Sequence, residues 1–445
     1  MSAVDAFEEP KISITPLLKR LWPSPAKENV TAAEIAGAIS HIFTNSLTPV
    51  QTGALLTALH FTGLDRQAEV LSKCALAMRN AANQVDRSSL LDAVHRRGRK
   101  EGLYRGGLCD IVGTGGDSHN TFNISTTASV LASALLLVAK HGNRSATSKS
   151  GSADMLTAVA PQPPVLSVVT PSSLARVYDT TNYAFLFAPV FHPGMRFVAP
   201  IRKELGWRTI FNLLGPLSNP VDSTTSSHRV SAPPLLEARV VGVARKDLGG
   251  AFAQSLVLSG VRKALVVCGD EDLDELSCAG ITHCWLVREK PNPDFRGGPD
   301  PEDDDFTTSD EEGPKRTIVD VETFVVAPED FGLPRHDLKD VAPGREPKEN
   351  AEMFGKILKD EMGNHPVVDF VLMNVAALFV ISGICEADSS DMGHGDGGKV
   401  ITERGPGGGR WKEGVRRARW AVSSGAALRQ WEKFIQVTNE IQKNG

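Results

Sequence analysis

This chain of 445 residues has few cysteines, no large excess of positive or negative charge, and no long apolar run. Its six cysteines lack the paired spacing of a zinc site, which indicates buried or free thiols in a reducing compartment. The formal net charge of −5 is not the basic excess typical of nucleic-acid binding. No apolar run approaches the roughly 18 residues of a membrane span, and the mixed N-terminal sequence is unlike a signal peptide. We therefore expect a cytoplasmic protein with neither nucleic-acid nor membrane partners.

The familiar nucleotide-binding motifs are absent as well. Residues 113–116 read Gly-Thr-Gly-Gly, without the Gly-Lys-Ser/Thr of a Walker A loop or the GxGxxG spacing of a dinucleotide site. Glycines nevertheless let backbone N–H groups approach an anion closely, and Asn123, Ser125 and Thr126 lie just ahead of a predicted helix. The glycine loop alone fits a tight structural turn equally well. With these additional donors it predicts an anion-binding site.

Two lysines flank a second glycine-containing loop. Lys140 and Lys149 offer the point charges with which proteins often bind phosphate, although either lysine alone would be a solvated cation. Because both loops follow predicted strands, they indicate a shared diphosphate site. His141 and Asn143, beside the second loop, offer directional hydrogen bonds. Their interpretation as turn residues bonded to the local backbone is equally good.

Two further groups of charged residues point to a metal and to a second substrate. The adjacent carboxylates of Asp274 and Glu275 suit Mg²⁺, which takes oxygen ligands and usually keeps waters and substrate phosphates. In isolation the pair would be an exposed acidic turn, but the phosphate loops favour a magnesium site that Ser125 could join. Arg202 and Arg208 can present planar guanidinium groups to a carboxylate. They suggest, without proving, a second substrate that bears a carboxylate.

The hydrophobic pattern predicts helices first and then alternating strands and helices. Residues 14–83 show apolar residues at helical spacing, whereas the polar and basic residues 84–107 predict a solvated loop. The apolar and hydroxyl-rich stretch 126–138 predicts a helix packed on all sides. Residues 183–187 are predicted as a buried strand or turn. Strands are predicted at 108–112, 238–242, 263–268, 282–287 and 317–326.

These elements predict an α/β protein with two domains. A small all-helical domain accompanies a large α/β domain, in which helices flank a central mixed sheet. The small domain is predicted at 1–105, rejoined by a segment at about 170–205. The large domain is predicted at 106–169 and 206–445.

Two segments interrupt the pattern of the large domain. Residues 288–316 contain a dense acidic run between prolines and glycines, and residues 386–410 are rich in glycine and aspartate. Low hydrophobicity and many turn formers predict flexible insertions at both places. Metal buffering by the acidic run is a weaker interpretation than a solvated surface loop.

Six motifs together resemble those of the anthranilate phosphoribosyltransferases. These tryptophan-pathway enzymes belong to the glycosyltransferase class that also holds the pyrimidine nucleoside phosphorylases. The motifs occur in family order, are jointly very specific, and extend the resemblance over most of the chain from Leu47 onward, apart from the insertions. They are DIVGTGGD (Asp110–Asp117), FNIST (Phe122–Thr126), KHGNR (Lys140–Arg144), KSGSAD (Lys149–Asp154), RTIFNLLGPLSNP (Arg208–Pro220) and LDELS (Leu273–Ser277).

The resemblance implies a role for each matched residue, with Mg²⁺ as the cofactor and no side chain as a general base. The implied metal ligands are Ser125, Asp274 and Glu275. The residues implied for anthranilate are Gly113, His141, Asn143, Arg202 and Gly215. The residues implied for phosphoribosyl pyrophosphate are Gly113, Gly115, Gly116, Asp117, Asn123, Ser125, Thr126, Lys140 and Ser152.

The implied reaction is transfer of a 5-phosphoribosyl group to the amine of anthranilate, with release of pyrophosphate. The resemblance also implies a homodimer joined through the small helical domain. Two alternatives stay open at this point. A pyrimidine nucleoside phosphorylase would use inorganic phosphate, and the KHGN segment and the Asp-Glu pair disfavour it. A non-catalytic nucleic-acid-binding relative is disfavoured by the net charge.

Overall fold

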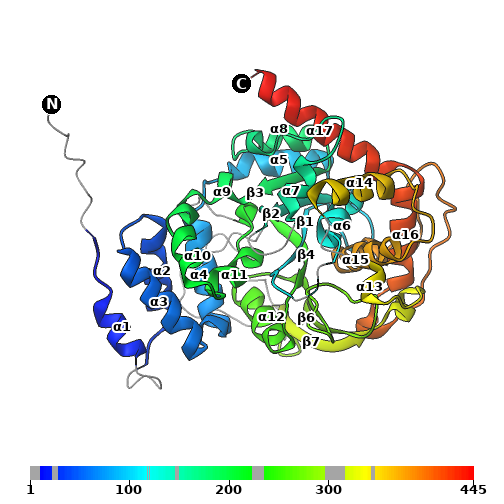
Figure 1. Ribbon diagram of the computed structural model, residues 1–445. Coiled ribbons are helices and arrows are strands. Elements are labelled where there is room, and N and C mark those ends of the chain that lie inside the picture. Colours follow the sequence, from blue (N-terminus) through cyan, green and yellow to red (C-terminus); the bar gives the residue numbers. More distant parts are fainter. Residues whose placement is uncertain are drawn as a thin grey trace.

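A mixed sheet crosses the middle of the protein (Figure 1). Its strand order is β3-β2-β1-β4-β5-β6-β7, with parallel pairing from β3 to β5 and antiparallel pairing of β6 and β7. The strands are β1 (Leu108–Gly113), β2 (Leu137–Gly142), β3 (Tyr183–Phe187), β4 (Leu236–Gly242), β5 (Lys263–Gly269), β6 (Thr282–Pro291) and β7 (Thr317–Val326). The computed structural model describes residues 11–22, 29–117, 119, 121–145, 150–222, 235–295, 316–341 and 346–444.

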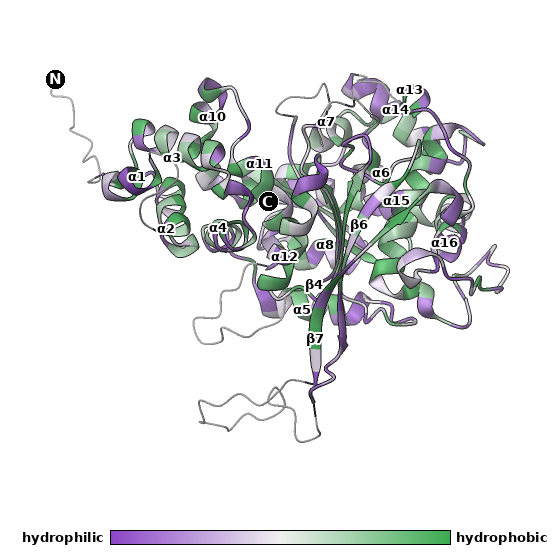
Figure 2. Cartoon of the chain, turned by 90° about the horizontal axis from the view of Figure 1, so that it is seen from below, coloured by the Kyte–Doolittle hydropathy of each residue, from purple (hydrophilic) through white to green (hydrophobic). Residues whose placement is uncertain are grey.

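Helices cover both faces of this sheet (Figures 1 and 2). The helices before β4 are α1 (Thr15–Leu21), α2 (Ala32–Phe43), α3 (Pro49–Thr62), α4 (Ala68–Asn80), α5 (Arg87–Arg97), α6 (Ile124–Ala132), α7 (Ser152–Thr157), α8 (Leu174–Thr180), α9 (Ala188–Phe191), α10 (Ala199–Leu205) and α11 (Ile210–Leu214). The later helices are α12 (Gly249–Leu258), α13 (Leu338–Val341), α14 (Pro347–Leu358), α15 (Pro366–Ser382), α16 (Trp411–Ser423) and α17 (Ala426–Asn444).

Alternate residues of the central strands join two different hydrophobic cores. In β5, Leu265 and Val267 belong to one core, whereas Ala264 and Val266 belong to the other. This follows from the period of two along a strand that is buried on both faces. The first core also contains α6, α15, α16 and α17, and the second contains α2, α3, α4 and α12. Figure 2 shows α1–α4 and α15–α16 on opposite sides of the sheet.

Helices α1 to α4 form a small helical unit with clear start signals. The Thr31 hydroxyl accepts a hydrogen bond from the Glu34 N–H, and the Glu34 carboxylate accepts one from the Thr31 N–H. This capping box begins α2. Pro49 follows the cap residue Thr48 at the start of α3. The unit reaches the sheet through α4, which packs on α12, and α12 in turn packs on β5.

The segment at about 170–205 serves both units. Its β3 pairs with β2 at the edge of the sheet, and α8 packs against β3. Its α10 packs against α3 of the helical unit. The chain therefore crosses from the sheet to the helical unit within this segment, and we keep the predicted domain boundaries as a proposal.

The prediction of a solvated loop at 84–107 was wrong in its central part. Residues 87–97 form α5, because the Asp86 side chain accepts a hydrogen bond from the Ser88 N–H and caps the helix. Leu90, Ala93 and Val94 share its buried face, which packs near α8. The basic residues of this segment, of which Arg96 is exposed and Arg97 is half-buried, masked this apolar spacing.

The predicted helix at 126–138 was too long. Helix α6 ends at Ala132, and the chain turns through Ser133 and Ala134 before β2 begins at Leu137. Both elements are buried on all sides, so no polar period separates them in the sequence. Continuous apolar runs do not distinguish a buried strand from a buried helix.

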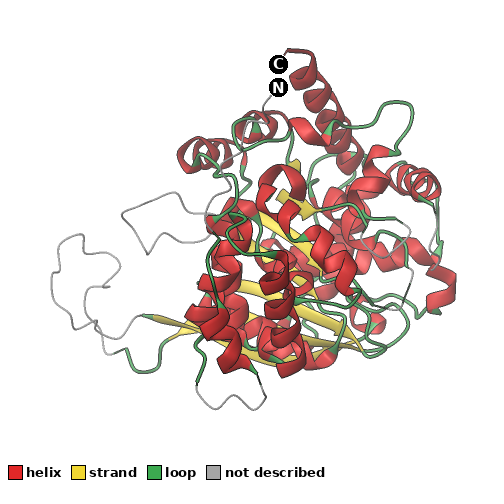
Figure 3. Cartoon of the chain, turned by 60° about the vertical axis from the view of Figure 1, so that its left-hand side comes forward, coloured by secondary structure: helices red, strands yellow, loops and turns green. Residues whose placement is uncertain are grey.

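The two predicted insertions differ in what the structure describes. Residues 386–410 contain little regular structure but carry an internal ion pair between Arg404 and Glu386 and a second pair that joins Asp396 to Arg416 of α16. Their flexibility remains a prediction. Residues 288–291 belong to β6, whereas 296–315 lie outside the described residues. Figures 2 and 3 show the ends of β6 and β7 extending beyond the surrounding helices.

The predicted fold class is confirmed, because a small helical unit stands beside a mixed sheet flanked by helices. Within the described ranges, no helix combines the length and apolar character required to cross a membrane. The sheet also fixes where a ligand can bind. The strand order reverses at β1, with β2 on one side and β4 on the other, and such a switch point opens a crevice at the carboxyl ends of the strands. Both predicted phosphate loops follow strands at this crevice.

Candidate active site

The loop that carries Asp274 lies across the carboxyl ends of β1 and β4. A Cβ atom added to Gly113 would lie 2.3 Å from Asp274 Oδ2. One added to Gly242 would lie 1.6 Å from the Asp274 carbonyl oxygen. Any side chain at either strand end would therefore displace this loop. The two glycines allow the carboxylate loop to reach the switch point of the sheet.

The glycine loop after β1 contacts both a carboxylate and an arginine. The Gly115 N–H donates a hydrogen bond to Asp274 Oδ2 at 2.6 Å, and Arg208 Nη2 donates one to the Gly115 carbonyl at 2.7 Å. Gly116 has a φ of +76°, and a Cβ atom there would lie 1.6 Å from Arg208 Nη1. The positive φ favours glycine at residue 116, and a Cβ atom there would also displace the Arg208 guanidinium from the loop.

Three carboxylates, those of Asp117, Asp274 and Glu275, gather at this point beside two cations, Lys140 and Arg208. Burial and the neighbouring charge of Asp274 raise the pKa of Asp117 to about 8. Burial, together with Asp274 and Asp117, raises the pKa of Glu275 well above its ordinary value. Glu275 Oε2 is buried without a hydrogen-bond partner in the described part of the chain. Excess negative charge of this kind favours a bound cation.

The same carboxylates do not form a closed metal cage. Over the described ranges, no group of three or more His, Cys, Asp or Glu side chains is arranged to hold a metal ion. Mg²⁺ commonly takes only one or two protein carboxylates and completes its shell with water and substrate phosphate. The donor set of Asp274 and Glu275 therefore fits Mg²⁺ better than a metal that needs an all-protein site.

Lys140 is a buried cation beside this cluster, with only 2% of its surface exposed. Its Nζ donates to the Ile111 carbonyl at 2.6 Å and to Ser125 Oγ at 3.3 Å. Burial lowers the pKa of Lys140, although nearby carboxylates favour its charged form. The Ser125 N–H donates to Glu275 Oε1 at 3.2 Å. Lys140, Ser125 and Glu275 are thus connected at the start of α6.

The second predicted loop is fastened to the same end of α6. Thr126 Oγ1 donates to Ser152 Oγ at 2.7 Å, and Asn123 Nδ2 donates to the Ser150 carbonyl at 3.0 Å. These bonds place the loops after β1 and β2 side by side, as a shared diphosphate site requires. Lys149, which the sequence also suggested, lies outside the described residues.

A second group of residues lies beside β2 and consists of His141, His192 and Gly215. The rings of His141 and His192 have centroids 5.1 Å apart. Burial is the main cause that lowers the pKa of His141 well below its ordinary value, so this ring is neutral at pH 7. Its buried Nε2 has no partner among the described residues. A Cβ atom built on Gly215 would meet no atom within 4 Å, which shows open space at this position.

The two arginines that the sequence grouped together have different contacts, although burial and the nearby charge of Arg208 both lower the pKa of Arg202. The guanidinium of Arg202, on α10, lies 5.9 Å from the ring centroid of Phe211, whereas Arg208 contacts the glycine loop. Asn143 Oδ1 accepts a hydrogen bond from the Arg144 N–H at 2.8 Å, as expected of a turn residue. Asn143 and Arg202 therefore have local partners, whereas hydrogen bonds join the predicted phosphate and metal residues to one another.

Asn219 was not identified from the sequence, although its side chain connects β1 and β2, the strands that precede the two predicted phosphate loops. Its Nδ2 donates to Asp110 Oδ2 and to the Ala139 carbonyl, both at 2.9 Å. Burial raises the pKa of Asp110, and the Asn219 amide opposes this shift. The available signal was the Asn219-Pro220 pair at the end of a turn-rich segment. In the sequence this segment served only as one motif of the family resemblance, and Asn219 was assigned no role.

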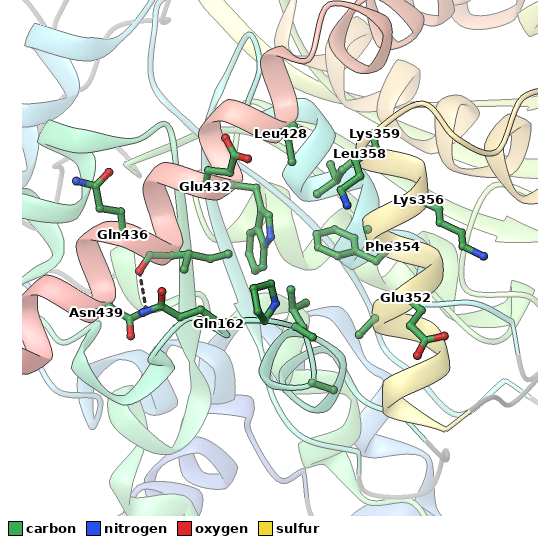
Figure 4. Close-up of a pocket in the computed structure, with 18 of the residues that line it drawn as sticks. Gln162, Glu352, Phe354, Lys356, Leu358, Lys359, Leu428, Glu432, Gln436 and Asn439 are labelled. Atoms are coloured by element: carbon green, nitrogen blue, oxygen red, sulfur yellow. Dashed lines mark hydrogen bonds between the residues drawn. The ribbon is translucent and has the colours of Figure 1, made fainter.

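A large cavity lies away from these residues (Figure 4). It has a volume of about 880 Å³ and lies between α14, α17 and residues 158–162. Phe354 and Leu358 line it from α14, and Leu428 and Glu432 line it from α17. Its lining includes none of the predicted site residues. Cavity size alone would thus misplace the site, which is identified instead by the polar groups at the strand ends.

The fold and the site together define a class of protein. A helical unit beside an α/β domain, with anion loops and paired carboxylates at the sheet's switch point, fits the glycosyl transferases. The sequence model described as glycosyl transferase family, a/b domain, matches residues 105–294 and 315–428. The model described as glycosyl transferase family, helical bundle domain, matches residues 15–82.

Individual relatives narrow this class. The anthranilate phosphoribosyltransferase of Schizosaccharomyces pombe is 35% identical over 425 residues, which cover 95% of this chain and 96% of the relative. A solved structure of the Saccharomyces cerevisiae enzyme in complex with PRPP and Mg has a TM-score of 0.69 and 29% identity, covering 95% of this chain and 97% of that one. The solved structure of the Thermus thermophilus enzyme has a TM-score of 0.66 and 30% identity, covering 93% of this chain and 97% of that one. The chain belongs to the anthranilate phosphoribosyltransferase family, which confirms the resemblance of the motifs.

Proposed function

We infer that this protein transfers the 5-phosphoribosyl group of phosphoribosyl pyrophosphate to the amine of anthranilate and releases pyrophosphate, a step of tryptophan biosynthesis. The observation that carries this inference is the hydrogen bond between Gly115 and Asp274. It joins an anion loop to a metal-type carboxylate at the switch point of the sheet. The substrates follow from the name shared by relatives that match nearly the whole chain.

Phosphoribosyl pyrophosphate is assigned to the two loops after β1 and β2. The bond between Thr126 and Ser152 and the bond between Lys140 and Ser125 support this assignment, because they gather hydroxyls and an ammonium group between the loops. Helix starts and ammonium groups both favour phosphate. The assigned residues are Gly113, Gly115, Gly116, Asp117, Asn123, Ser125, Thr126, Lys140 and Ser152.

Mg²⁺ is assigned to Ser125, Asp274 and Glu275. Two observations support the fit: the buried, unpartnered Oε2 of Glu275, and the raised pKa of Asp117 beside Asp274. Both reflect negative charge that a divalent cation would offset. When bound, Mg²⁺ would stabilise the charge that develops on pyrophosphate as the bond from C1 of the ribose to the leaving oxygen breaks.

The anthranilate site is assigned to the side of β2 that carries His141. The open space at Gly215 suits a flat ring, and the neutral His141 Nε2 is available to accept a hydrogen bond from the amine. Arg202 would bind the carboxylate of anthranilate through its planar guanidinium group. The assigned residues are Gly113, His141, Asn143, Arg202 and Gly215.

The residues of the chain would act mainly by binding and positioning. The amine of anthranilate is already neutral at pH 7, so we assign no general base. Lys140 would hold charge against the departing pyrophosphate, and its burial strengthens that interaction because the surroundings have a low dielectric constant. Arg202 and His141 would hold the amine in line with C1 of the ribose.

Product formation from anthranilate and phosphoribosyl pyrophosphate tests this function directly. Loss of anthranilate fluorescence should require both substrates and Mg²⁺. Turnover of thymidine or uridine with inorganic phosphate, but not of anthranilate, would support a nucleoside phosphorylase instead. Salt-dependent DNA binding without either activity would support a nucleic-acid-binding relative.

A homodimer and a cytoplasmic location complete the proposal. On α3, Val50 is 81% exposed and Phe61 is 67% exposed, and Ala54 lies on the same face between them. Such an apolar face suits an interface through the helical unit. Sedimentation equilibrium should show a dimer that Phe61→Glu weakens. A monomeric wild-type protein would contradict the proposed dimer.

A further inference from the structure

We propose that Asn374 is a positioning residue that holds the metal-binding carboxylates in place, a role that rests on the proposed function. Asn374 lies on α15 and does not belong to the predicted site. Its Oδ1 accepts a hydrogen bond from the Leu276 N–H at 3.2 Å, and its Nδ2 donates to the Leu276 carbonyl at 3.4 Å. Leu276 directly follows Glu275. One side chain therefore fixes both backbone groups of the residue next to the metal carboxylates.

The surroundings of Asn374 show why the bonds matter. The residue is 2% exposed in a helix whose side chains are otherwise mainly apolar and buried. A buried amide costs free energy unless it is hydrogen-bonded. Its Nδ2 also donates to the Phe370 carbonyl at 3.0 Å. With two carbonyl acceptors on one side and one N–H donor on the other, only this orientation of the amide pairs every group.

The carboxylate loop is also held at its flanks. Before Glu275, the Asp274 side chain accepts from the Gly115 N–H. After it, the Ser277 N–H donates to Thr282 Oγ1 at 2.8 Å. Asn374 supplies the contact between these two anchors and connects the loop to the long helix α15. Without it, Leu276 would keep a buried N–H and carbonyl that have lost their partners, and the loop would relax.

A matched control comes from a second buried asparagine. Asn350, on α14, is also 2% exposed, and its Nδ2 donates to Asn123 Oδ1 at 2.9 Å. It supports the phosphate loop rather than the carboxylate loop. Replacement of either asparagine by leucine removes a buried amide of the same size from a helix. Both variants should lose stability through removal of a buried amide. They differ in the loop that loses its support, which is the carboxylate loop in Asn374→Leu and the phosphate loop in Asn350→Leu.

The test compares Asn374→Leu with Asn350→Leu in two measurements. Calorimetric titration of Mg²⁺ alone should give a dissociation constant about ten- to hundredfold higher for Asn374→Leu, as for other residues that support metal ligands. The constant for Asn350→Leu should stay close to the wild-type value. The KM for anthranilate should change little in Asn374→Leu. If circular dichroism shows that Asn374→Leu does not fold, Asn374→Ala replaces it.

A double-mutant cycle separates positioning from general loosening. In the background of Glu275→Gln, Asn374→Leu should weaken Mg²⁺ binding much less than it does in the wild type, because both changes act on one interaction. Equal Mg²⁺ losses in Asn374→Leu and Asn350→Leu, or full additivity in the cycle, would overturn the proposal. Wild-type protein that binds Mg²⁺ but leaves anthranilate unreacted would contradict the proposed function instead. The calorimetric comparison would still decide the role of Asn374.

Discussion

Arg208 covers Gly116 so closely that a Cβ atom at residue 116 would lie 1.6 Å from Arg208 Nη1. Burial lowers the pKa of Arg208, whereas the charges of Asp274 and Asp117 favour its protonated form. Arg208 is therefore a counter-ion for the glycine loop and the carboxylates. Arg202, on α10, lies beside Phe211 instead, and we therefore propose a different role for each arginine.

The two arginines should give opposite kinetic signatures. Arg202→Ala should raise the KM for anthranilate about tenfold or more, because a charged hydrogen bond is lost, and should change the KM for phosphoribosyl pyrophosphate much less. Arg208→Ala should raise mainly the KM for phosphoribosyl pyrophosphate. Initial-rate kinetics with each substrate varied in turn measures both. Arg196→Ala, at an exposed arginine just before α10, serves as the control. Equal effects of Arg202→Ala on both substrates would contradict its assignment.

The paired carboxylates should control the dependence on Mg²⁺. The double variant Asp274→Asn with Glu275→Gln should lower turnover about a hundredfold or more, since the charge that holds the cation at the leaving group is removed. Titration of activity with Mg²⁺ should show a weaker and less steep response. Asp270→Asn, at a carboxylate in the same loop that pairs with His283, should keep normal Mg²⁺ dependence. Full activity of the double variant would exclude the metal assignment.

Replacement of Gly215 by alanine should leave the stability of the protein nearly unchanged but weaken its binding of anthranilate. A Cβ atom at this position meets no atom within 4 Å, so Gly215→Ala should unfold at nearly the wild-type temperature. The methyl group would occupy space assigned to the anthranilate ring and should raise the KM for anthranilate several-fold. Gly37→Ala adds a methyl group at an equally open position on α2 and should leave that KM unchanged. Identical kinetics for both variants would place anthranilate elsewhere.

His192 should make stability depend on pH. Burial lowers its pKa from an ordinary value of 6.5 to about 4, and its Nε2 lies 3.0 Å from the Ser218 carbonyl. Because the unfolded chain binds the proton more readily, this contribution to stability is complete above about pH 6.5 and is lost as pH falls toward 4. The loss amounts to roughly 3 kcal/mol. Urea unfolding of the wild type and of His192→Gln between pH 4 and 7 should show a smaller slope in the variant, and parallel slopes would refute the linkage.

Much of the fold followed from local patterns in the sequence. The capping box at Thr31 and Glu34 and the proline at the start of α3 are local signals, and helices begin at both places in the structure. Short strands between helical stretches predicted the mixed sheet. The glycine loop and the Asp274-Glu275 pair were recognisable because their chemistry is contained in a few adjacent residues. Their roles in binding remain proposals.

Other features depend on contacts between distant segments, and no local pattern reveals them. Asn219 and Asn374 act through hydrogen bonds to groups on other elements, Asn219 to Asp110 and Ala139 and Asn374 to Leu276. An asparagine in a turn or an apolar helix gives no sign of its partner. The end of α6 at Ala132 was hidden because helix and strand are buried on all sides. Helix α5 was missed because the basic residues of its segment outweighed its buried apolar face.

The central place of β1 in the sheet has a consequence for synthesis. During translation β1 can pair early with β2, whereas its other edge waits for β4, where Leu236 meets Leu108. Pairing between strands so far apart in the chain is slow, and an unpaired edge invites association with other chains. The glycine loop is thus synthesised long before Asp274 and Glu275. The protein can therefore become active only late in folding. The yield of active enzyme should depend on how well the open β1 edge is protected from association until then.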